Sequence, residues 1–357
     1  MRQIHRFVMS AAVIGTAVLG ALATSPGQAA EVQAHHFKGV ASFSSSPVYK
    51  TRAVPYWEAI QKETKGKITV DLLTIDQLGF KGDEVFRMLK MGLFDFVTNV
   101  MSFAAGDDAR NESLDLAGIT QDIPELHKMA DAYRPILVDL YQKKYNLKLM
   151  GMWPIGPVVV WCNKPASSLA DLNGLKIRGF NKTMSDFLKS AGAVPVAMSF
   201  GDIVTALSRG TIDCAITSTR SGLKMGLAEV TTHIVPITLG WATVIEAFNA
   251  KTWARLDKAT QDYLAAKYAE HEKHVYGIVQ EETADAYRCL TGKKPCNDPG
   301  AMKNPLTVAT VSDADKNKIR EIVKNAVLPG WAKRCGADCV AQWNQTVGKQ
   351  ADIVIGK

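Results

Sequence analysis

The sequence predicts an α/β protein of two lobes that are joined by a hinge and a long helix. Strands alternate with helices in the first half of the chain, and the same alternation starts again after a break rich in Pro and Gly at residues 153–157. A third stretch, residues 252–290, contains little Gly or Pro and is amphipathic. Alternation of this kind is typical of a mostly parallel sheet covered by helices. The 357 residues suffice for two domains, each with its own core.

The N-terminus has the pattern of a secretory signal peptide. Arg2 and Arg6 precede an apolar run over residues 8–22, which is followed by small residues ending at residues 27–30. The run is shorter than the roughly 20 residues that a membrane helix needs, which disfavours the alternative of a retained anchor. We therefore expect residues 1–30 to be cleaved and the mature protein to lie free in the periplasm.

The expected elements of the first lobe are bounded by turn residues. Val54, Trp57 and Ile60 fall on one helical stripe, and Gly92 ends a helix. In order, we expect a strand at 33–41, a helix at 54–64, a strand at 67–73, a helix at 83–91, a strand at 94–100, a helix from 122 towards 145 with a kink at Pro135, and a strand at 147–153.

The second lobe repeats this order. We expect strands at 158–162, 175–179, 194–197 and 212–217, with helices at 182–191 and up to about 209. Residues 88–95 and 206–213 have the same pattern, in which a helix ends at Gly, two residues and an Asp follow, and a strand begins. This repeat is short enough to arise by coincidence. If it is genuine, the strand ends at 99–102 and 216–218 are equivalent and face each other across a cleft, where open α/β sheets bind ligands.

The hinge and the long helix fix the expected lobe boundaries. We expect crossings at 153–157 and 241–248, which assigns residues 31–154 and about 243–283 to lobe I, and residues 155–242 and about 284–357 to lobe II. Periodicity leaves two alternatives for the helix at 252–290. It either spans both lobes as a spine or packs on one lobe only.

The six cysteines divide into two close pairs and two isolated residues. In an oxidising compartment we expect disulfides between Cys289 and Cys296 and between Cys335 and Cys339, in preference to zinc, because no His neighbours either pair. Cys162 and Cys214 lie in apolar strand-like runs. They are interpreted as buried thiols, with pairing to each other left open.

Charge and motifs exclude several functions. The formal net charge of +7 becomes about +5 once Arg2 and Arg6 are removed, and the basic residues are dispersed, so we expect no nucleic-acid partner. The sequence lacks the nucleophile elbow, the zinc-protease motif, the phosphate-binding loop and the dinucleotide fingerprint. His271 and His274 share a helix face, which is interpreted as a solvated face rather than a metal site. We predict no enzyme and no cofactor.

The most distinctive motifs of the sequence lie in residues 169–217. They are residues 169–178 (Leu-Ala-Asp-Leu-Asn-Gly-Leu-Lys-Ile-Arg), 193–196 and 202–206, and others occur at 68–70, 77–79, the Asp95 strand, the Asn163 turn and 251–253. In this order and spacing they resemble the extracytoplasmic binding proteins of tripartite ATP-independent periplasmic (TRAP) transporters, the dicarboxylate-binding family. The resemblance covers nearly all of the mature chain. It implies a two-lobed periplasmic binding protein fold with a spine helix, closure on an organic acid, and delivery to membrane permease subunits. A binding protein of an ABC importer or a sensor would share the cleft and remains the alternative.

The family's carboxylate contact corresponds to Arg178. A guanidinium presents two parallel donors that match a carboxylate and keeps its charge when desolvated. The chain departs from the family at Pro157 and Val158, where a second polar ligand residue is common. It also departs at residues 214–220, where Thr217 and Ser218 could replace an amide's hydrogen bonds. Arg220 is either a second cation in the cleft or a surface residue.

The lobe I wall is expected to be largely aromatic and apolar, as small-ligand pockets usually are. We expect it to include Phe43, Ser45, Phe80, Asn99 and Met101. Trp241 lies in the second crossing. With Val158 in place of a polar partner, this wall predicts a monocarboxylate with an apolar or aromatic body rather than a sugar acid. We also expect the protein to be a monomer.

Overall fold

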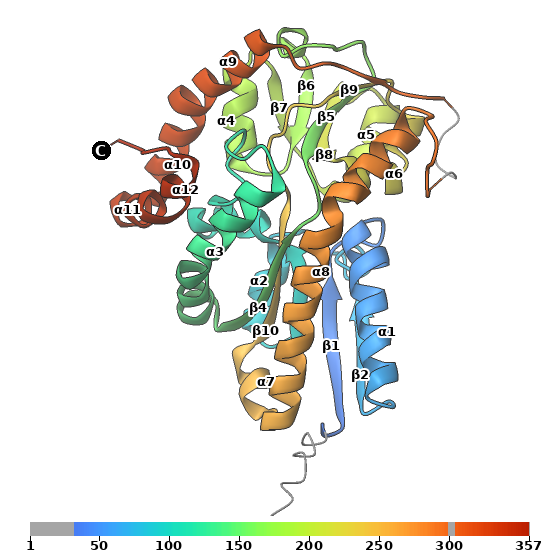
Figure 1. Ribbon diagram of the computed structural model, residues 1–357, viewed down its shortest axis with the longest axis vertical. Coiled ribbons are helices and arrows are strands. Elements are labelled where there is room, and N and C mark those ends of the chain that lie inside the picture. The colour runs from blue at the N-terminus through green and yellow to red at the C-terminus, as the bar shows by residue number, and fades with distance from the viewer. Residues whose placement is uncertain (1–31, 299–303, 357) are drawn as a thin grey trace, which may run out of the picture. The chain divides into compact units, whose positions relative to one another are not determined.

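The computed structural model describes residues 32–298 and 304–356, so the predicted signal peptide lies outside the described residues. In the described part of the chain, eleven strands form one sheet of five and one of six. Helices cover both sheets (Figure 1). The two-lobed α/β class predicted from the sequence is confirmed. The lobe boundaries given above stay a prediction, and we refer below to a first and a second sheet.

The first sheet has the strand order β2-β1-β3-β10-β4. β1 pairs in parallel with β2 and β3, whereas β10 is antiparallel to both β3 and β4. β3 is buried on both faces, as expected for a central strand. The bounds are β1 (His35–Ala41), β2 (Ile68–Leu73), β3 (Phe96–Val100), β4 (Leu147–Pro154) and β10 (Thr243–Asn249).

The second sheet has the order β11-β9-β5-β8-β6-β7. β6 is parallel to β7 and β8, while β5 is antiparallel to β8 and β9. Each sheet therefore contains one strand that reverses the parallel pattern expected from the alternation. The bounds are β5 (Val158–Cys162), β6 (Lys176–Gly179), β7 (Val194–Ala197), β8 (Cys214–Ser218), β9 (His233–Val235) and β11 (Thr307–Val308).

Helical segments connect these strands. Those before β5 are η1 (Val48–Ala53), α1 (Val54–Glu63), α2 (Glu84–Lys90), η2 (Met101–Gly106), η3 (Ala109–Glu112), α3 (Ile123–Leu140) and η4 (Tyr141–Tyr145). Those between β5 and β10 are η5 (Ala170–Leu172), α4 (Lys182–Ser190), η6 (Phe200–Asp202), α5 (Ile203–Ser208), α6 (Thr219–Lys224) and η7 (Leu227–Glu229). α3 continues through Pro135 and begins at Asp122, whose side chain accepts a hydrogen bond from the Glu125 backbone N–H.

The chain crosses between the sheets three times, and the first two crossings, from β4 to β5 and from β9 to β10, lie side by side. The backbone N–H of Ile155 donates to the Trp241 carbonyl (3.1 Å), and that of Val158 donates to the Gly240 carbonyl (2.9 Å). The second crossing is shorter than the expected 241–248, because from Thr243 onward the chain is already paired in β10.

The buried carboxylate of Asp115 holds the second crossing in place. It accepts the backbone N–H groups of Trp241 (2.9 Å) and Thr243 (2.8 Å). Between them Ala242 has a left-handed backbone (φ 49°), which is uncommon for a residue with a side chain. Burial raises the pKa of Asp115, although these hydrogen bonds oppose the shift. The crossing is therefore fixed by a buried polar contact rather than by Gly flexibility.

The long helix α8 (Lys258–Leu290) runs alongside elements of both sheets (Figure 1). It packs on β4 and α3 and, further along, on α6, which follows β8. Of the two alternatives, the structure thus has the spine. The helix is shorter than the predicted 252–290, because α7 (Ala250–Arg255) ends first and Asp257 caps the start of α8, where its side chain accepts the Thr260 backbone N–H. None of the helices in the described ranges is both long and apolar enough to span a membrane.

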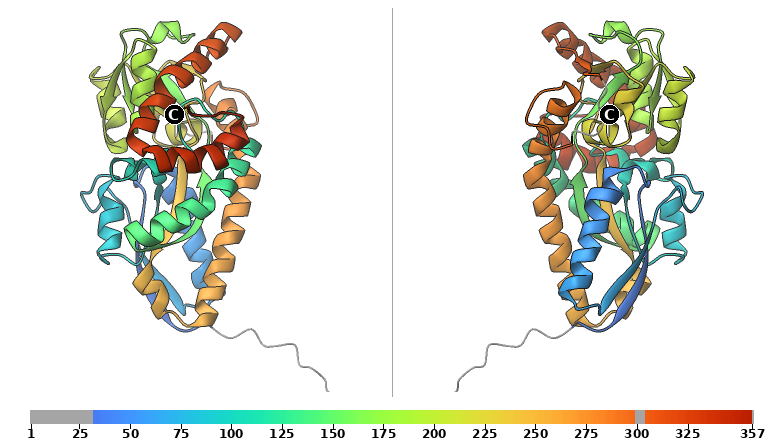
Figure 2. Two further views of the ribbon diagram at one scale, coloured as in Figure 1. Left: turned by 90° about the vertical axis from the view of Figure 1, so that its left-hand side faces the viewer. Right: turned by 90° about the vertical axis from the view of Figure 1, so that its right-hand side faces the viewer.

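The C-terminal helices fold back over the chain (Figure 2). They are α9 (Asp313–Ile322), η9 (Val323–Val327), α10 (Leu328–Cys335), α11 (Ala337–Trp343), η10 (Asn344–Gly348) and α12 (Lys349–Ala351). They pack on α3, η3 and α4. Two fully buried tryptophans anchor them, since Trp331 donates to the Ala109 carbonyl (2.8 Å) and Trp343 to the Ser113 carbonyl (3.1 Å).

All six cysteines are paired. The predicted disulfides Cys289–Cys296 and Cys335–Cys339 are both present. Cys162 and Cys214 also form a disulfide, which corrects the interpretation of two buried thiols. They face each other in the register of β5 and β8, and this antiparallel pairing brings the two residues together.

Candidate functional site

Arg178 lies near the end of β6, between β7 and β8, and its side chain is only 1% exposed. Its Nε donates to the Met198 carbonyl (3.1 Å) and its Nη1 to the Ile216 carbonyl (2.9 Å). Nη2 has no hydrogen-bond partner among the described residues. The two backbone contacts therefore orient the guanidinium and leave donors available for another group.

The charge of Arg178 is not neutralised by the protein. No carboxylate in the described ranges forms an ion pair with it, and Asp202 acts on it only at longer range. Burial lowers its pKa to about 9, so the group still carries its charge at neutral pH. A buried cation without a partner is costly. The site is therefore electrostatically incomplete without an anion.

A small cavity of about 30 Å³ lies beside the guanidinium. Its lining comes from both sheets and the first two crossings, and Arg178 is its only charged residue. The lining residues are Ser42, Phe43, Ser46, Val100, Phe103, Ile155, Arg178, Phe180, Phe200, Thr217, Ser221 and Ala242. A groove that shares Phe43, Phe103 and Arg178 leads outward past Lys81 and Asp202.

Four of the twelve lining residues are phenylalanines, and they meet in pairs from opposite sheets. Phe43, which follows β1, lies 5.5 Å from Phe200 between ring centroids, and Phe103 in η2 lies 6.1 Å from Phe180, which follows β6. Phe43 and Phe103 also meet edge to face at 6.4 Å. The Phe180 ring centroid is 5.4 Å from Arg178 Cζ, within cation–π range. The cavity is thus a predominantly aromatic chamber with one cation.

Polar side chains in the cavity are few, and most are already engaged. Ser46 Oγ accepts the Val48 backbone N–H (3.2 Å). Ser218, the cap of α6, donates to Ser221 Oγ (2.8 Å) and accepts the Ser221 N–H, so it supports the cavity wall from behind. Neither Thr217 Oγ1 nor Ser42 Oγ has a hydrogen-bond partner in the described part of the chain. Both hydroxyls are therefore available in the cavity that Arg178 lines.

Five other residues predicted for the site lie outside this cavity. Ser45 is replaced by its neighbour Ser46, and Phe80 packs on the core. Asn99 donates to the Gly82 carbonyl (3.3 Å) because strand alternation turns its neighbour Val100 towards the cavity. Met101 is fully buried in the core. Trp241 donates its indole N–H to the Thr120 carbonyl (3.2 Å), which leaves Ala242 at the cavity.

Arg220 is turned away from Arg178. It does not line the cavity, and its Nη1 lies 3.3 Å from Glu282 Oε1 on α8. Its side chain is 19% exposed, so it is not a surface residue either. Arg220 is therefore neither a second cation in the cleft nor a surface residue, because Glu282 on the long helix pairs with it.

Several cavity residues had not been predicted from the sequence. Phe180 could have been found, because it follows Arg178 by two positions and so lies on the same side of the strand end. Phe103 and Phe200 lie in short 3₁₀ turns, and Ala242 lies in the crossing. Such segments have no periodicity that reveals which side chain points inward.

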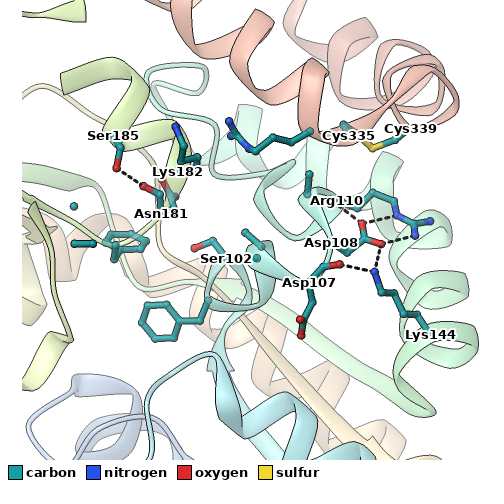
Figure 3. A pocket seen from close by; sticks show the side chains of 18 of the residues that line it. Ser102, Asp107, Asp108, Arg110, Lys144, Asn181, Lys182, Ser185, Cys335 and Cys339 are labelled. Carbon is teal, nitrogen blue, oxygen red and sulfur yellow. Dashed lines mark hydrogen bonds and ion pairs between the residues drawn. A yellow bond between two sulfur atoms is a disulfide. The ribbon is translucent and has the colours of Figure 1, made fainter. Parts of the chain in front are cut away.

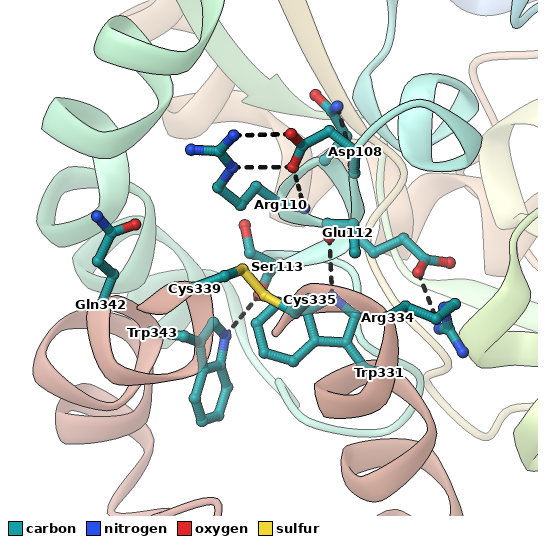
Figure 4. The surroundings of a disulfide bond; sticks show 12 residues. Asp108, Arg110, Glu112, Ser113, Trp331, Arg334, Cys335, Cys339, Gln342 and Trp343 are labelled. Atoms are coloured by element: carbon teal, nitrogen blue, oxygen red, sulfur yellow. Dashed lines mark hydrogen bonds and ion pairs between the residues drawn. A yellow bond between two sulfur atoms is a disulfide. The ribbon is translucent and has the colours of Figure 1, made fainter. Parts of the chain in front are cut away.

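A larger depression lies beside the chamber and shares Phe103 and Phe180 with the chamber and Met198 with the groove. Its cations are paired with carboxylates, as Figure 3 shows for Asp108, which contacts Arg110 (2.7 Å) and Lys144 (2.9 Å). Next to the Cys335–Cys339 disulfide, Arg334 pairs with the buried Glu112 (3.0 Å; Figure 4). The unpaired cation is in the chamber and not in this depression.

Comparisons with known proteins identify the family of this chain. Residues 40–327 match the family model described as bacterial extracellular solute-binding protein, family 7. The chain is 26% identical over 294 residues to the C4-dicarboxylate-binding periplasmic protein DctP of Rhodobacter capsulatus, covering 81% of this chain and 84% of that protein.

Solved structures share the fold. DctP7, a Bordetella pertussis extracytoplasmic solute receptor binding pyroglutamic acid, matches with a TM-score of 0.77 at 20% identity, covering 88% of this chain and 99% of that one. A TRAP periplasmic solute-binding protein from Desulfovibrio salexigens with bound orotic acid matches with a TM-score of 0.76 at 18% identity, covering 88% and 99%. A two-sheet fold with a cation in the chamber between the sheets defines a solute-binding protein. This chain belongs to the bacterial extracellular solute-binding proteins of family 7.

Proposed function

We propose that this protein captures a small organic acid in the Phe-lined chamber and delivers it to the membrane permease subunits of a TRAP transporter. The observation that carries the proposal is Arg178, a buried cation whose Nη2 is free and which no described carboxylate neutralises. A carboxylate there would restore neutrality through two charge-assisted hydrogen bonds. Family membership supports the role in transport.

The ligand we propose is a monocarboxylate with a compact apolar or aromatic body. The chamber offers one cation, the free hydroxyls of Thr217 and Ser42, and four Phe rings, so a second carboxylate or several sugar hydroxyls would lose hydrogen bonds with water without full replacement. A flat ring would stack on Phe rings instead. The pyroglutamic and orotic acids bound by the two similar receptors are small rings with one carboxylate.

The chain is proposed to act after export, as a monomer in the periplasm. Arg2 and Arg6 with the apolar run behind them support export, and the three disulfides suit an oxidising compartment. Size-exclusion chromatography with light scattering tests the monomer, and a mass of twice the mature chain would contradict it.

A thermal-shift screen of the mature protein against organic acids tests the ligand. The panel contains pyroglutamate, orotate, benzoate, branched-chain 2-oxo acids, succinate, glucuronate and sialate, and calorimetry follows for those that raise the melting temperature. We expect ring and branched monocarboxylates to bind. Tight binding of glucuronate or sialate without binding of ring or branched acids would refute the apolar ligand, and no shift with any acid would refute the function.

A further inference from the structure

Three charged side chains from different parts of the fold meet away from the chamber. Arg52 on η1 pairs through Nη2 with Oε2 of Glu282 on α8, and Arg220 on α6 lies 3.3 Å from the other oxygen of the same carboxylate. The three side chains are 11%, 17% and 19% exposed for Arg52, Glu282 and Arg220. We call this cluster the Arg52–Glu282–Arg220 triad.

Each arginine of the triad belongs to a segment that continues one wall of the chamber. η1 follows directly on the loop that contains Phe43 and Ser46, and it packs on β1 and β3 of the first sheet. Arg220 stands between Thr217 and Ser221, at the end of β8 in the second sheet. One carboxylate therefore connects the wall from the first sheet with the wall from the second.

The triad contains two positive charges and one negative charge, so the carboxylate is needed to hold the two arginines close together. Two guanidinium groups share one anion in a mostly buried place, and Arg220 Nε has no partner in the described structure. Burial lowers the pKa of Arg52, and the neighbouring Arg220 lowers it further, while Glu282 opposes both effects. Without Glu282, two desolvated cations would repel each other across the junction of the walls.

We propose that Glu282 is a positioning residue that ties the two walls of the chamber together and thereby raises the affinity for the bound acid. The proposal rests on the proposed function, because it concerns the same chamber. Glu282 touches neither the cavity nor Arg178, so it acts through Arg52 and Arg220. We call the arrangement in which the two walls meet the joined arrangement, and the one in which they lie apart the separated arrangement. The acid favours the joined arrangement only through contacts that it makes better there. A contact within the protein that stabilises the joined arrangement therefore raises the apparent affinity for the acid.

The neighbouring Glu281 provides a matched control. It lies on the same helix, is 72% exposed, and pairs with Arg288 of the same helix (2.7 Å). Glu281→Gln therefore removes the same charge and an ion pair without touching either wall. Glu282→Gln keeps the side-chain volume and removes only the charge of the tie.

Distance measurements between spin labels on the two sides of the chamber give the first readout. Labels are placed on Met91→Cys after α2 and Val194→Cys at the start of β7, positions that are 58% and 48% exposed. All native cysteines are in disulfides, so the labels react only at the introduced thiols. Distance distributions are recorded by pulsed electron resonance without added acid and with saturating pyroglutamate, and pyroglutamate affinity is measured by calorimetry.

We expect Glu282→Gln to lower the joined-to-separated population ratio, or the pyroglutamate affinity, at least about ten-fold relative to Glu281→Gln, because breaking a buried ion cluster is strongly unfavourable. If Glu282→Gln does not fold, Arg52→Gln replaces it, since it cuts one side of the tie and leaves a neutral Glu282–Arg220 pair. Identical distance distributions and affinities in the Glu282 and Glu281 variants would overturn the proposal. Failure of the proposed function gives a different result from failure of this proposal. The wild type would then bind no acid, while the distance distributions recorded without acid would still show whether Glu282 holds the two walls together.

Discussion

Replacing Arg178 with Met removes the only charge that lines the chamber while roughly preserving the volume of the side chain. A hydrogen bond to a charged group contributes about 1.5–3 kcal/mol, so two bonds to a carboxylate contribute about 3–6 kcal/mol. This corresponds to roughly two to four orders of magnitude in the dissociation constant. We therefore expect Arg178→Met to abolish acid binding in calorimetry at concentrations where the wild type is saturated.

The stability of the acid-free protein should change little, because two effects oppose each other. The variant loses hydrogen bonds to the Met198 and Ile216 carbonyls, each contributing about 0.5–1.5 kcal/mol, but it also loses a buried cation without an ion-pair partner. We expect the two melting temperatures without acid to agree within a few degrees. At an acid concentration of 100 times the dissociation constant, the wild type should gain about 2.7 kcal/mol and the variant nothing.

Thermal unfolding with and without acid checks both parts. The control is Arg209→Met, which removes an exposed arginine that follows α5 and should behave as the wild type. A melting temperature more than about 10 °C lower without acid would show that Arg178 is a structural residue. An undiminished acid-induced shift in the variant would show that the carboxylate is bound elsewhere.

Three more predictions follow from the contacts described above. Phe180→Ala removes the ring beside Arg178 Cζ and should weaken acid binding several-fold in calorimetry, since a desolvated cation–π contact contributes about 1–2 kcal/mol; unchanged affinity would count against the aromatic chamber. Joint replacement of Cys162 and Cys214 by Ala should lower the free energy of unfolding by about 2–5 kcal/mol in urea, and equal stability would contradict a role for this cross-strand bond. Hydrogen bonds from Arg110 and Lys144 outweigh burial and hold the pKa of Asp108 below its usual value, so this carboxylate stabilises the fold above pH about 4 and less as the pH falls below it. In urea unfolding from pH 6 to pH 3, Asp108→Asn should therefore lose less stability than the wild type, and parallel curves would refute the assignment.

The fold could be predicted from the sequence because its signals are local. Helices ending at Gly92 and Gly210, the apolar strands and the break at 153–157 depend on residues close together in the chain. The antiparallel placement of β10 and β5 has no such signal, since it depends on which strands meet after the crossings. The Cys162–Cys214 disulfide was left open for the same reason, because it follows from the register of β5 on β8.

Of the residues predicted for the site, the structure places Arg178, Phe43 and Thr217 at one cavity. Arg178 has a distinctive motif and a side chain suited to a carboxylate, whereas the identity of its neighbours depends on the path of two crossings. Alternation put Val100 rather than Asn99 at the cavity, and the Asp115 contact put Ala242 rather than Trp241 there. Arg220 could not be placed, because its partner Glu282 comes much later in the chain, on a helix whose facing residues depend on the packing of the whole protein.

The place of β10 in the first sheet has a consequence for biosynthesis. β3 and β4 are not neighbours, because β10 fills the gap between them, and residues 101–242 separate β3 from this partner in the chain. The first sheet therefore cannot close while only the N-terminal half has emerged from the ribosome, and such long-range pairing is slow to form. For the export that we propose, this order is an advantage, since the first half of the chain alone offers no finished sheet that would block passage of the unfolded chain. The same strand order predicts that a fragment ending at Pro154 will not fold alone.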